Sequence, residues 1–303
     1  MDIIYGDKIV PYSGTAVVLG DFDGLHAAHT KLVTKGLEYA KEKSLNCGVL
    51  LFKENTKSVL ENTSIKLITT NEEKIKLLDN MGVDFVYMVD FDHKFMSKTP
   101  LEFVSYLSQK LMTKAAFVGY DYKFGYGACG NAATLSELGK KYGIETIVIP
   151  QMKIKGKTVS STYIRNLICT GNVEEAALFL GRYFSIEGIV EKGFQNGRKL
   201  GFPTANVAYN RNMVLPGIGV YAGFTYVRGN KYKSVINVGK NPTFNADRIT
   251  VESHILGFDA DIYDENVRVS FIKRLRGDIK FSSLEALVEQ IKKDAKTAEN
   301  LLI

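Results

Sequence analysis

The chain carries in residues 15–29 the segment Thr15-Ala16-Val17-Val18-Leu19-Gly20-Asp21-Phe22-Asp23-Gly24-Leu25-His26-Ala27-Ala28-His29, and an amphipathic stretch follows over 30–43. The five residues before Gly20 fit a buried strand, and the two glycines allow the backbone to turn tightly and approach a ligand. A helix that starts at such a turn points free N–H groups and the positive end of its dipole at phosphate. The segment therefore predicts a strand–turn–helix unit with an anion site at the turn.

The same alternation of strand and helix patterns continues through the first half of the chain. Expected strands cover residues 15–19, 48–52, 84–89, 115–118 and 145–149. Expected helices lie between them at residues 30–43, 71–80, 100–112 and 132–142. Strands that alternate with helices predict a parallel sheet covered on both faces. Such sheets bind ligands at the carboxyl ends of their strands.

The second half reads differently. Short alternating segments at 220–228, 232–238, 250–256 and 267–274 are separated by Gly, Pro and Asn, which predicts an antiparallel sheet or small barrel. Ser282-Ser283-Leu284-Glu285 then opens a C-terminal helix with an N-cap serine and an acidic first turn. We place the boundary near Gly181, after two helical segments between Ser161 and Leu180. The expected domains are residues 1–181 and 182–303.

Composition limits the class of protein. The 303 residues are 45% hydrophobic and 24% charged, with a formal net charge of +6. Runs of about five or six basic residues, which mark nucleic-acid arms, are absent, and so are apolar runs of about 20 residues, which a bilayer requires. The start lacks a signal-peptide pattern, and three scattered cysteines suggest no disulfide framework. We expect a cytoplasmic protein with small anionic ligands and no nucleic-acid or membrane partner.

Two of the four histidines fall in the glycine-rich turn. His26 and His29 are three residues apart and would share one helical face. Their imidazoles could donate hydrogen bonds to a phosphate chain and stabilise charge that builds on phosphorus and on departing pyrophosphate. The alternative is a structural role, which is common for a lone histidine on a helix.

A second phosphate site is predicted near Thr204 and Asn206. The segment 193–206 joins a glycine-rich loop to Pro203 and to these two oxygen-bearing side chains. Residues two apart share one face of a strand, so both could reach one magnesium–nucleotide complex. The alternative is a plain turn followed by an edge strand.

Three segments of the first half resemble the adenylyltransferase half of bacterial bifunctional riboflavin kinase/FAD synthetases. Residues 20–29 resemble the histidine–any–glycine–histidine signature of nucleotidyltransferases, Gly119-Tyr120-Asp121-Tyr122-Lys123-Phe124-Gly125 resembles the family's flavin-side loop, and Ser160-Ser161-Thr162-Tyr163-Ile164-Arg165 resembles its ATP-phosphate segment. The resemblance implies charge stabilisation by His26, His29 and Arg165 and flavin contacts from Asp121 and Phe124. It implies nucleotide binding by Gly20, Phe22, Asp23, Gly24, Ser160, Ser161 and Thr162.

The second half resembles riboflavin kinases. Gly201-Phe202-Pro203-Thr204-Ala205-Asn206 matches their signature, and residues 216–222, 237–244, 251–256 and 275–278 follow in family order. The resemblance implies nucleotide binding by Gly201, Pro203, Thr204 and Asn206, with Mg²⁺ on Thr204 and Asn206. It implies Glu252 as general base and Arg276 near the flavin, where a structural ion pair is the alternative for Arg276.

The resemblance implies an α/β parallel-sheet nucleotidyltransferase domain followed by a mainly antiparallel β-barrel domain with a C-terminal helix. The substrates would be riboflavin, FMN and ATP, with FMN and then FAD as products. The sequence sets no oligomeric state.

Four departures from the family pattern keep alternatives open. Ala28 replaces a glycine, Asp21 replaces an asparagine, residues 52–56 replace Pro-His-Pro, and Gln195-Asn196 replaces Gly-Arg. Lys53 could supply charge in place of the missing histidine. One alternative keeps a single activity, with riboflavin kinase favoured and the other domain a scaffold or flavin-binding module. Another is a flavin-responsive regulator that binds nucleic acid.

Overall fold

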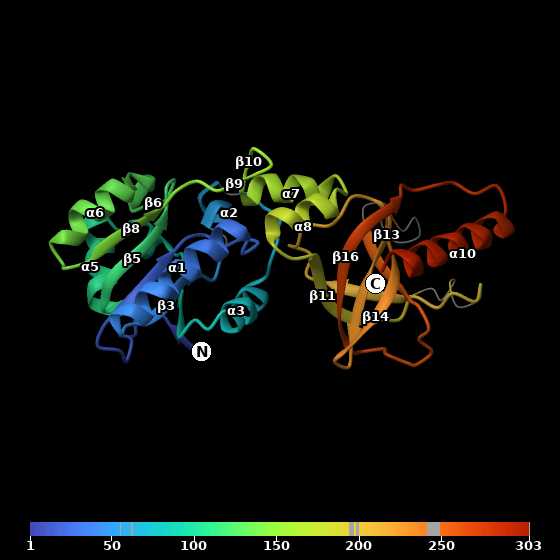
Figure 1. Ribbon diagram of the computed structural model, residues 1–303, viewed down its shortest axis with the longest axis horizontal. Helices are drawn as coiled ribbons and strands as arrows, with labels where there is room; N and C mark the ends of the chain where they lie inside the picture. The colour runs from blue at the N-terminus through green and yellow to red at the C-terminus, as the bar shows by residue number, and fades with distance from the viewer. Residues whose placement is uncertain (55, 62, 194–196, 198–199, 241–248, 303) are drawn as a thin grey trace. The chain divides into compact units, whose positions relative to one another are not determined.

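The computed structural model describes residues 1–303 except 55, 62, 194–196, 198–199, 241–248 and 303 (Figure 1). The chain forms two compact units, Met1–Ser161 and Thr162–Ile303. Each is described by itself.

The first unit is built on a parallel sheet. Its strands are β1 (Asp2–Tyr5), β2 (Thr15–Leu19), β3 (Asn46–Phe52), β4 (Phe85–Val89), β5 (Thr113–Gly119) and β8 (Glu145–Ile149), in the order β1-β4-β3-β2-β5-β8. Every pairing in this sheet is parallel. The five expected strands are confirmed. Strand β1 was not predicted, because a four-residue, largely exposed edge strand leaves little hydrophobic pattern.

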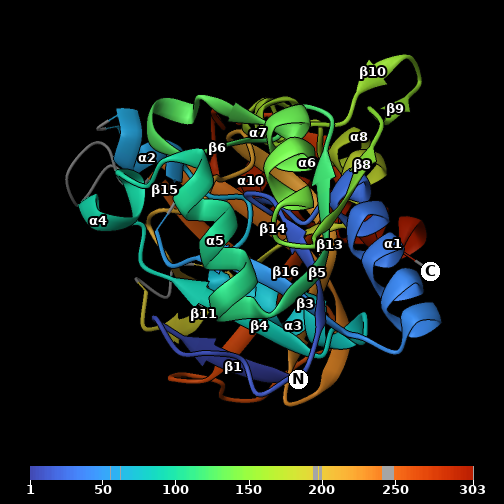
Figure 2. The same ribbon diagram turned by 90° about the vertical axis from the view of Figure 1, so that its left-hand side faces the viewer.

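Helices cover both faces of this sheet. They are α1 (Ala27–Lys43), α3 (Asn71–Asn80), α5 (Pro100–Leu111) and α6 (Ala132–Lys140). Leu32 of α1 and Leu78 of α3 pack with Val18, whereas Leu107 of α5 and Leu135 of α6 pack with the neighbouring Val17. Figure 2 shows α1 and α5 on opposite sides of the strands. The expected two-sided cover is confirmed.

The sheet reverses its strand order at β2. Strand β2 pairs with β3 on one side and β5 on the other, and the helices that lead to those two flanks lie on opposite faces. A reversal of this kind opens a crevice at the carboxyl ends of the two central strands. Residues 20–24 follow β2 directly, so the glycine-rich turn lies at this switch point.

Shorter elements complete the first unit. They are α2 (Thr56–Glu61), α4 (His93–Met96), β6 (Lys123–Phe124), the 3-10 turn η1 (Tyr126–Ala128), β7 (Gly130–Asn131), β9 (Lys153–Ile154) and β10 (Lys157–Thr158). Strands β6 and β7 form one small antiparallel pair, and β9 and β10 form another.

The second unit contains a closed antiparallel barrel. Its strands are β11 (Phe184–Glu191), β12 (Ala205–Tyr209), β13 (Gly219–Val227), β14 (Asn230–Lys240), β15 (Ile249–Ile255) and β16 (Asn266–Arg276), in the order β11-β12-β15-β14-β13-β16. Strand β11 also pairs with β16, which closes the barrel. The expected small barrel is confirmed.

Three helices accompany the barrel in the sequence, and two of them contact its strands. They are α7 (Ser161–Cys169), α8 (Val173–Leu180) and the C-terminal α10 (Leu284–Leu301). Helix α8 contacts β11 and β16, and α10 contacts β13, β14 and β16. Helix α10 is capped by Ser283, whose hydroxyl accepts from the N–H of Ala286 at 3.2 Å, as the sequence predicted. The two predicted helical segments after residue 160 therefore belong to the compact unit that holds the barrel, and a functional boundary near Gly181 stays a prediction.

The barrel interior is filled by side chains. The rings of Tyr221 and Phe271 are fully buried and meet edge to face at 5.5 Å. Three buried hydroxyls form a chain, with Ser234 donating to Thr225 at 2.9 Å and Thr225 lying 2.7 Å from Ser253. A filled interior confines any ligand to the ends or outside of the barrel.

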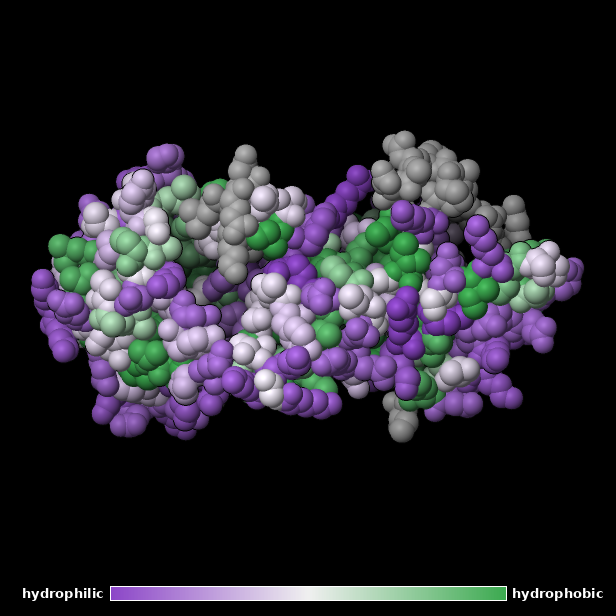
Figure 3. All heavy atoms as spheres, turned by 90° about the horizontal axis from the view of Figure 1, so that it is seen from above, coloured by the Kyte–Doolittle hydropathy of each residue, from purple (hydrophilic) through white to green (hydrophobic). Residues whose placement is uncertain are grey.

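The surface is mostly hydrophilic on the face shown in Figure 3, with hydrophobic side chains in separated small patches over both units. Among the described residues, no helix combines the length and apolar character needed to cross a membrane.

Close packing in the first unit can be tested at Gly48. A Cβ at this position would lie 2.0 Å from Cζ of the fully buried Phe85. We expect Gly48→Ala to lower the free energy of unfolding of this unit by about 1–3 kcal/mol, because the ring has to move. Urea denaturation measures the change, with exposed Lys31→Ala as a control expected to stay within about 0.5 kcal/mol. Equal stability of the two variants would contradict this packing.

Candidate active sites

The turn after β2 adopts an unusual backbone conformation. Phe22, Gly24 and Leu25 have φ angles of 53°, 85° and 37°. Left-handed conformations are costly for residues with a Cβ and persist where the surroundings impose them. The Phe22 ring also packs on Gly20, where a Cβ would lie 3.1 Å from the ring Cζ. The surrounding residues of the first unit therefore impose the conformation of this turn.

Asp23 anchors this turn. Its side chain is fully buried, and Oδ1 accepts from the N–H of Ile68 at 2.9 Å and of Thr69 at 3.2 Å. The N–H of Gly24 donates to Thr69 Oγ1 at 2.9 Å, and the Ser161 hydroxyl donates to the Asp23 carbonyl at 2.8 Å. The structure thus brings Asp23, Gly24 and Ser161 together through hydrogen bonds that fix the backbone of the turn after β2. Their contact with a nucleotide stays a prediction.

His26 and His29 form a stacked pair at the start of α1. His26 is the N-cap residue, and its Nδ1 accepts from the N–H of His29 at 3.3 Å. The ring centroids are 3.7 Å apart with an interplanar angle of 9°. Because Nδ1 accepts, a neutral His26 carries its proton on Nε2. The three-residue spacing places the two rings side by side, although His26 is the N-cap with an extended backbone and not a residue of the helix itself.

The environment of His29 favours the neutral imidazole. Burial, followed by the charges of His26 and Lys74, holds the pKa of His29 well below its usual range. The Nδ1 atom is enclosed and has no hydrogen-bond partner among the described residues. The Phe22 ring lies 5.1 Å away, which adds an apolar neighbour.

Lys74 is a site residue that the sequence did not reveal. It lies in α3 with 6% of its surface exposed, and its ammonium is 3.5 Å from the carbonyl oxygen of Asp21. A lysine in an amphipathic helix normally points to solvent. Only the packing of α3 beside the β2 turn shows otherwise.

The structure describes some of the residues at which the sequence departs from the family pattern. Ala28 is the second residue of α1, and the Asp21 carboxylate accepts a hydrogen bond from Thr56 at 3.4 Å. Lys53 forms an ion pair with Asp90 at 2.6 Å, so its charge is already engaged. Asn55, Gln195 and Asn196 lie outside the described residues.

Other predicted residues of the nucleotidyltransferase site lie in separate places. Asp121 is exposed, whereas Phe124 is buried and stacks on Tyr122 with centroids 5.8 Å apart. Ser160 and Thr162 flank the first residue of α7. Arg165 lies in the second compact unit, so its approach to the histidine pair stays a prediction.

In the barrel, Glu252 lies directly opposite Asn206. The two residues are paired in the β12–β15 register, and Asn237 of β14 is the neighbour of Glu252 on its other side. Val251 and Ser253 are buried while Glu252 is half-buried, which confirms the predicted alternation. Burial raises the pKa of the Glu252 carboxyl, and a hydrogen bond from Thr250 opposes this shift. A raised pKa suits a group that accepts a proton near neutral pH.

A cavity of about 380 Å³ opens beside this strand pair. Thr204, Asn206 and Gly193 line it, together with Val190, Pro203, Ala205, Ser253, Ile255 and residues 258–263. A Cβ on Gly193 would lie 2.2 Å from the Asn206 amide nitrogen, so only glycine fits against that side chain. Thr204 and Asn206 thus line one cavity, whereas Glu252 is not among its lining residues, and binding of a magnesium–nucleotide complex there stays a prediction.

His254 holds the signature segment in place. Its Nδ1 lies 2.8 Å from the carbonyl oxygen of Pro203, so it donates there. Its ring meets Phe202 edge to face at 5.6 Å. Gly201 has a φ of 84°, which lets the chain turn before this contact. These contacts give His254 a structural role.

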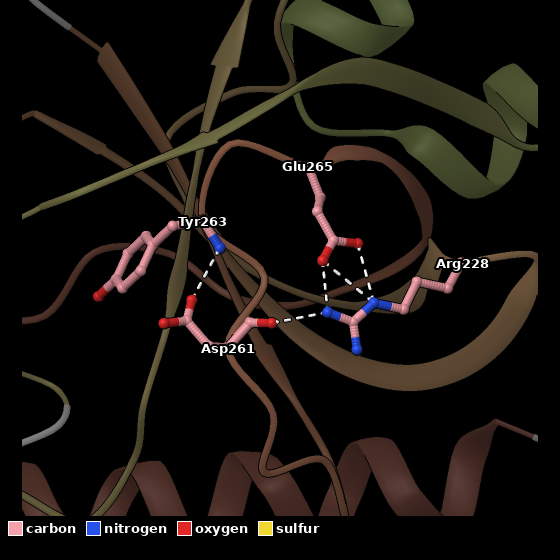
Figure 4. A network of polar contacts seen from close by, with 4 residues as sticks. All are labelled: Arg228, Asp261, Tyr263 and Glu265. Atoms are coloured by element: carbon pink, nitrogen blue, oxygen red, sulfur yellow. Dashed lines mark hydrogen bonds and ion pairs between the residues drawn. The ribbon is translucent and has the colours of Figure 1, made fainter.

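The loop 258–263 was missed by sequence reasoning although it lines the cavity. Arg228 holds it: its Nε donates to both carboxylate oxygens of Glu265, at 3.1 and 3.0 Å, and its Nη2 donates to the Asp261 carbonyl at 2.8 Å (Figure 4). The Asp261 carboxylate in turn accepts from the N–H of Tyr263 at 3.0 Å. Asp261 and Tyr263 read as ordinary turn residues, and their link to Arg228 across more than thirty positions has no local signal.

Arg276 forms the ion pair that was its alternative interpretation. Its Nε donates to Asp294 of α10 at 2.9 Å, and both side chains are largely buried. Asp294 also accepts from Gln290 at 2.8 Å. The pair ties the end of β16 to α10, and contact between Arg276 and a flavin stays a prediction.

Comparison with known proteins finds a family match for each half of the chain. A family model for FAD synthetase matches residues 10–163, and one for riboflavin kinase matches residues 180–302. A bifunctional riboflavin kinase/FMN adenylyltransferase from Bacillus subtilis is 33% identical over 290 residues, which cover 94% of this chain and 91% of the relative. The chain belongs to this bifunctional family. A relative of the same name from Escherichia coli is 34% identical over 95% of this chain and 93% of its own length.

A solved structure also matches this chain along almost its full length. It is described as a macrolide-efflux protein from Streptococcus pneumoniae, and it is 31% identical with a TM-score of 0.89 over 99% of each chain. The likeness covers both the parallel-sheet unit and the barrel unit.

The low pKa of His29 can be measured by NMR. We expect the imidazole signals to report a neutral ring down to well below pH 6.5, because the enclosing residues and Lys74 disfavour its charged form. Loss of the signals in His29→Gln assigns them. Since the folded-state pKa lies below the unfolded one, the contribution of His29 to stability is complete above about pH 6.5 and falls as the pH drops. Titration at or above pH 6.5 would contradict the described environment.

Proposed function

We propose that this chain transfers the γ-phosphoryl group of ATP to riboflavin, giving FMN and ADP, and then the adenylyl group of a second ATP to FMN, giving FAD and pyrophosphate. The observation that carries the proposal is that each family-matched unit brings together side chains suited to phosphate chemistry. One is the histidine pair at the switch point of the sheet, and the other is Glu252 opposite Asn206 beside a cavity.

In the kinase reaction, Glu252 acts as the general base. The 5′-hydroxyl of riboflavin attacks the γ-phosphorus, its proton passes to the Glu252 carboxylate, and the bond from the γ-phosphorus to the bridging oxygen breaks. Phosphoryl transfer depends mainly on positioning and charge stabilisation. The cavity beside Thr204 would receive the nucleotide, with Gly201 and Pro203 shaping its edge and Arg228 fixing its outer loop.

The neutral oxygens of Thr204 and Asn206 suit a Mg²⁺–ATP complex. Magnesium usually takes one or two protein oxygens and completes its shell with phosphate and water. The described residues contain no group of three or more His, Cys, Asp or Glu that could hold a metal without the nucleotide. When bound, the ion would neutralise phosphate charge. Thr204 and Asn206 would orient the phosphates toward Glu252.

In the adenylyltransferase reaction, a phosphate oxygen of FMN attacks the α-phosphorus of ATP. A bond from that oxygen to the α-phosphorus forms as the bond to pyrophosphate breaks, without a covalent enzyme intermediate. His26 Nε2 and the free N–H groups of α1 would donate to the phosphate chain. Neutral His29 and Arg165 would add further donors. Asp121 and Phe124 would contact the flavin, and Gly20, Phe22, Ser160 and Thr162 the nucleotide.

The bifunctional interpretation is favoured over a single activity by both family models and by relatives that span both units. Family membership likewise favours an enzyme over a nucleic-acid-binding regulator. We propose that the enzyme acts in the cytoplasm on small-molecule substrates and has no nucleic-acid or membrane partner.

Separation of products tests the proposal. Purified protein with riboflavin, ATP and Mg²⁺ is expected to yield FMN and FAD, resolved by chromatography. Glu252→Gln should lower FMN formation about 100-fold because no base remains, and should leave FAD formation from supplied FMN intact. His29→Ala should do the reverse, with FMN accumulating. Unphosphorylated riboflavin with the unaltered protein would overturn the proposal.

Metal binding at the barrel can be tested through Thr204. Thr204→Val removes one oxygen at nearly constant volume, so we expect the Mg²⁺ concentration for half-maximal kinase rate to rise about tenfold. Adenylylation of FMN should not change. Thr297→Val, on the exposed side of α10, is the matched control. An unchanged Mg²⁺ dependence would remove Thr204 from the metal site.

A further inference from the structure

Lys74 is a buried cation without a counter-ion. Only 6% of its surface is exposed, and its polar side-chain contact is the Asp21 carbonyl at 3.5 Å. Among residues that the structure describes, no carboxylate lies within ion-pair distance of its ammonium. A buried charge is costly unless it is paired, so retention of a lysine here points to an anion that is supplied from outside.

The surroundings of Lys74 identify where that anion would lie. The Asp21 carbonyl belongs to the turn at the switch point, and the Lys74 charge acts on His29, which stacks on His26. The start of the 17-residue helix α1 lies at the same turn. The Lys74 ammonium, the histidine pair and the start of α1 therefore lie at the same turn.

The nearby acidic groups are engaged elsewhere. Asp23 accepts from the N–H groups of Ile68 and Thr69, and Asp21 accepts from Thr56. The other lysine expected to bring charge to this edge, Lys53, is paired with Asp90. These carboxylates therefore do not neutralise the positive charge of Lys74, which can act on a ligand.

We propose that Lys74 is a phosphate-binding residue of the adenylyltransferase site, where its ammonium contacts the polyphosphate of ATP and the departing pyrophosphate. The inference rests on the proposed FMN adenylylation. The pyrophosphate leaves with its added negative charge on the oxygen released from the α-phosphorus, and Lys74 stabilises that charge without transferring a proton. Burial is the main cause of the lowered pKa of His29, and the charge of Lys74 adds to it.

The experiment compares Lys74→Met with the exposed Lys76→Met on the same helix. Loss of a charge-assisted contact is expected to lower kcat/KM for FMN adenylylation and the affinity for inorganic pyrophosphate by about tenfold to a hundredfold. Riboflavin phosphorylation should stay unchanged in both variants. Lys74→Arg should recover part of the loss, and the His29 signals of Lys74→Met should titrate at a higher pH.

Two outcomes separate this inference from the proposed function. If no FAD forms but Lys74→Met binds pyrophosphate more weakly than the unaltered protein and Lys76→Met, FMN adenylylation fails while the Lys74 contact stands. If Lys74→Met binds pyrophosphate like Lys76→Met, the contact is overturned. Should Lys74→Met not fold, hydrogen–deuterium exchange of unaltered protein decides: added pyrophosphate must protect residues 71–78, and no protection there overturns the inference.

Discussion

The buried carboxylate of Asp23 is the interaction on which the first unit's site depends. It joins the turn after β2 to the backbone of Ile68 and Thr69, which immediately precede α3. Because a buried carboxylate must find donors, this contact fixes both the left-handed turn and the entry into α3. One result is the stacked histidine pair at the start of α1. The other is the approach of Lys74 to the same turn.

In the barrel unit, strand register positions the candidate site residues. Antiparallel pairing sets Asn206 opposite Glu252, while the buried Ser253 beside it joins the hydroxyl chain of the filled interior. A shift of one residue would exchange these faces, so the interior packing and the outer site enforce the same register. His254 and Arg228 then hold the two segments that border the cavity.

The two candidate sites differ in the chemistry that their side chains can offer to a phosphate group. The first unit offers two stacked imidazoles at a helix start, with burial lowering the pKa of His29, which suits stabilisation of charge at the α-phosphorus without a base. The barrel offers a half-buried carboxylate whose pKa is raised by burial, which suits removal of a proton from a hydroxyl. This difference follows from the nucleophiles: the phosphate of FMN is already ionised, whereas the hydroxyl of riboflavin is not.

The sequence alone determined the fold class, five of the six strands of the sheet and four of the six strands of the barrel, because local periodicity places residues on faces and at strand ends. Spacing alone also pointed to the pairs His26–His29 and Thr204–Asn206. Tertiary structure alone decided the burial of Lys74, the pairing of Arg276 with Asp294 and of Lys53 with Asp90, and the loop held by Arg228. A charged side chain has the same local pattern whether it meets water, a partner or a ligand. Only packing between distant segments removes the water and distinguishes the three.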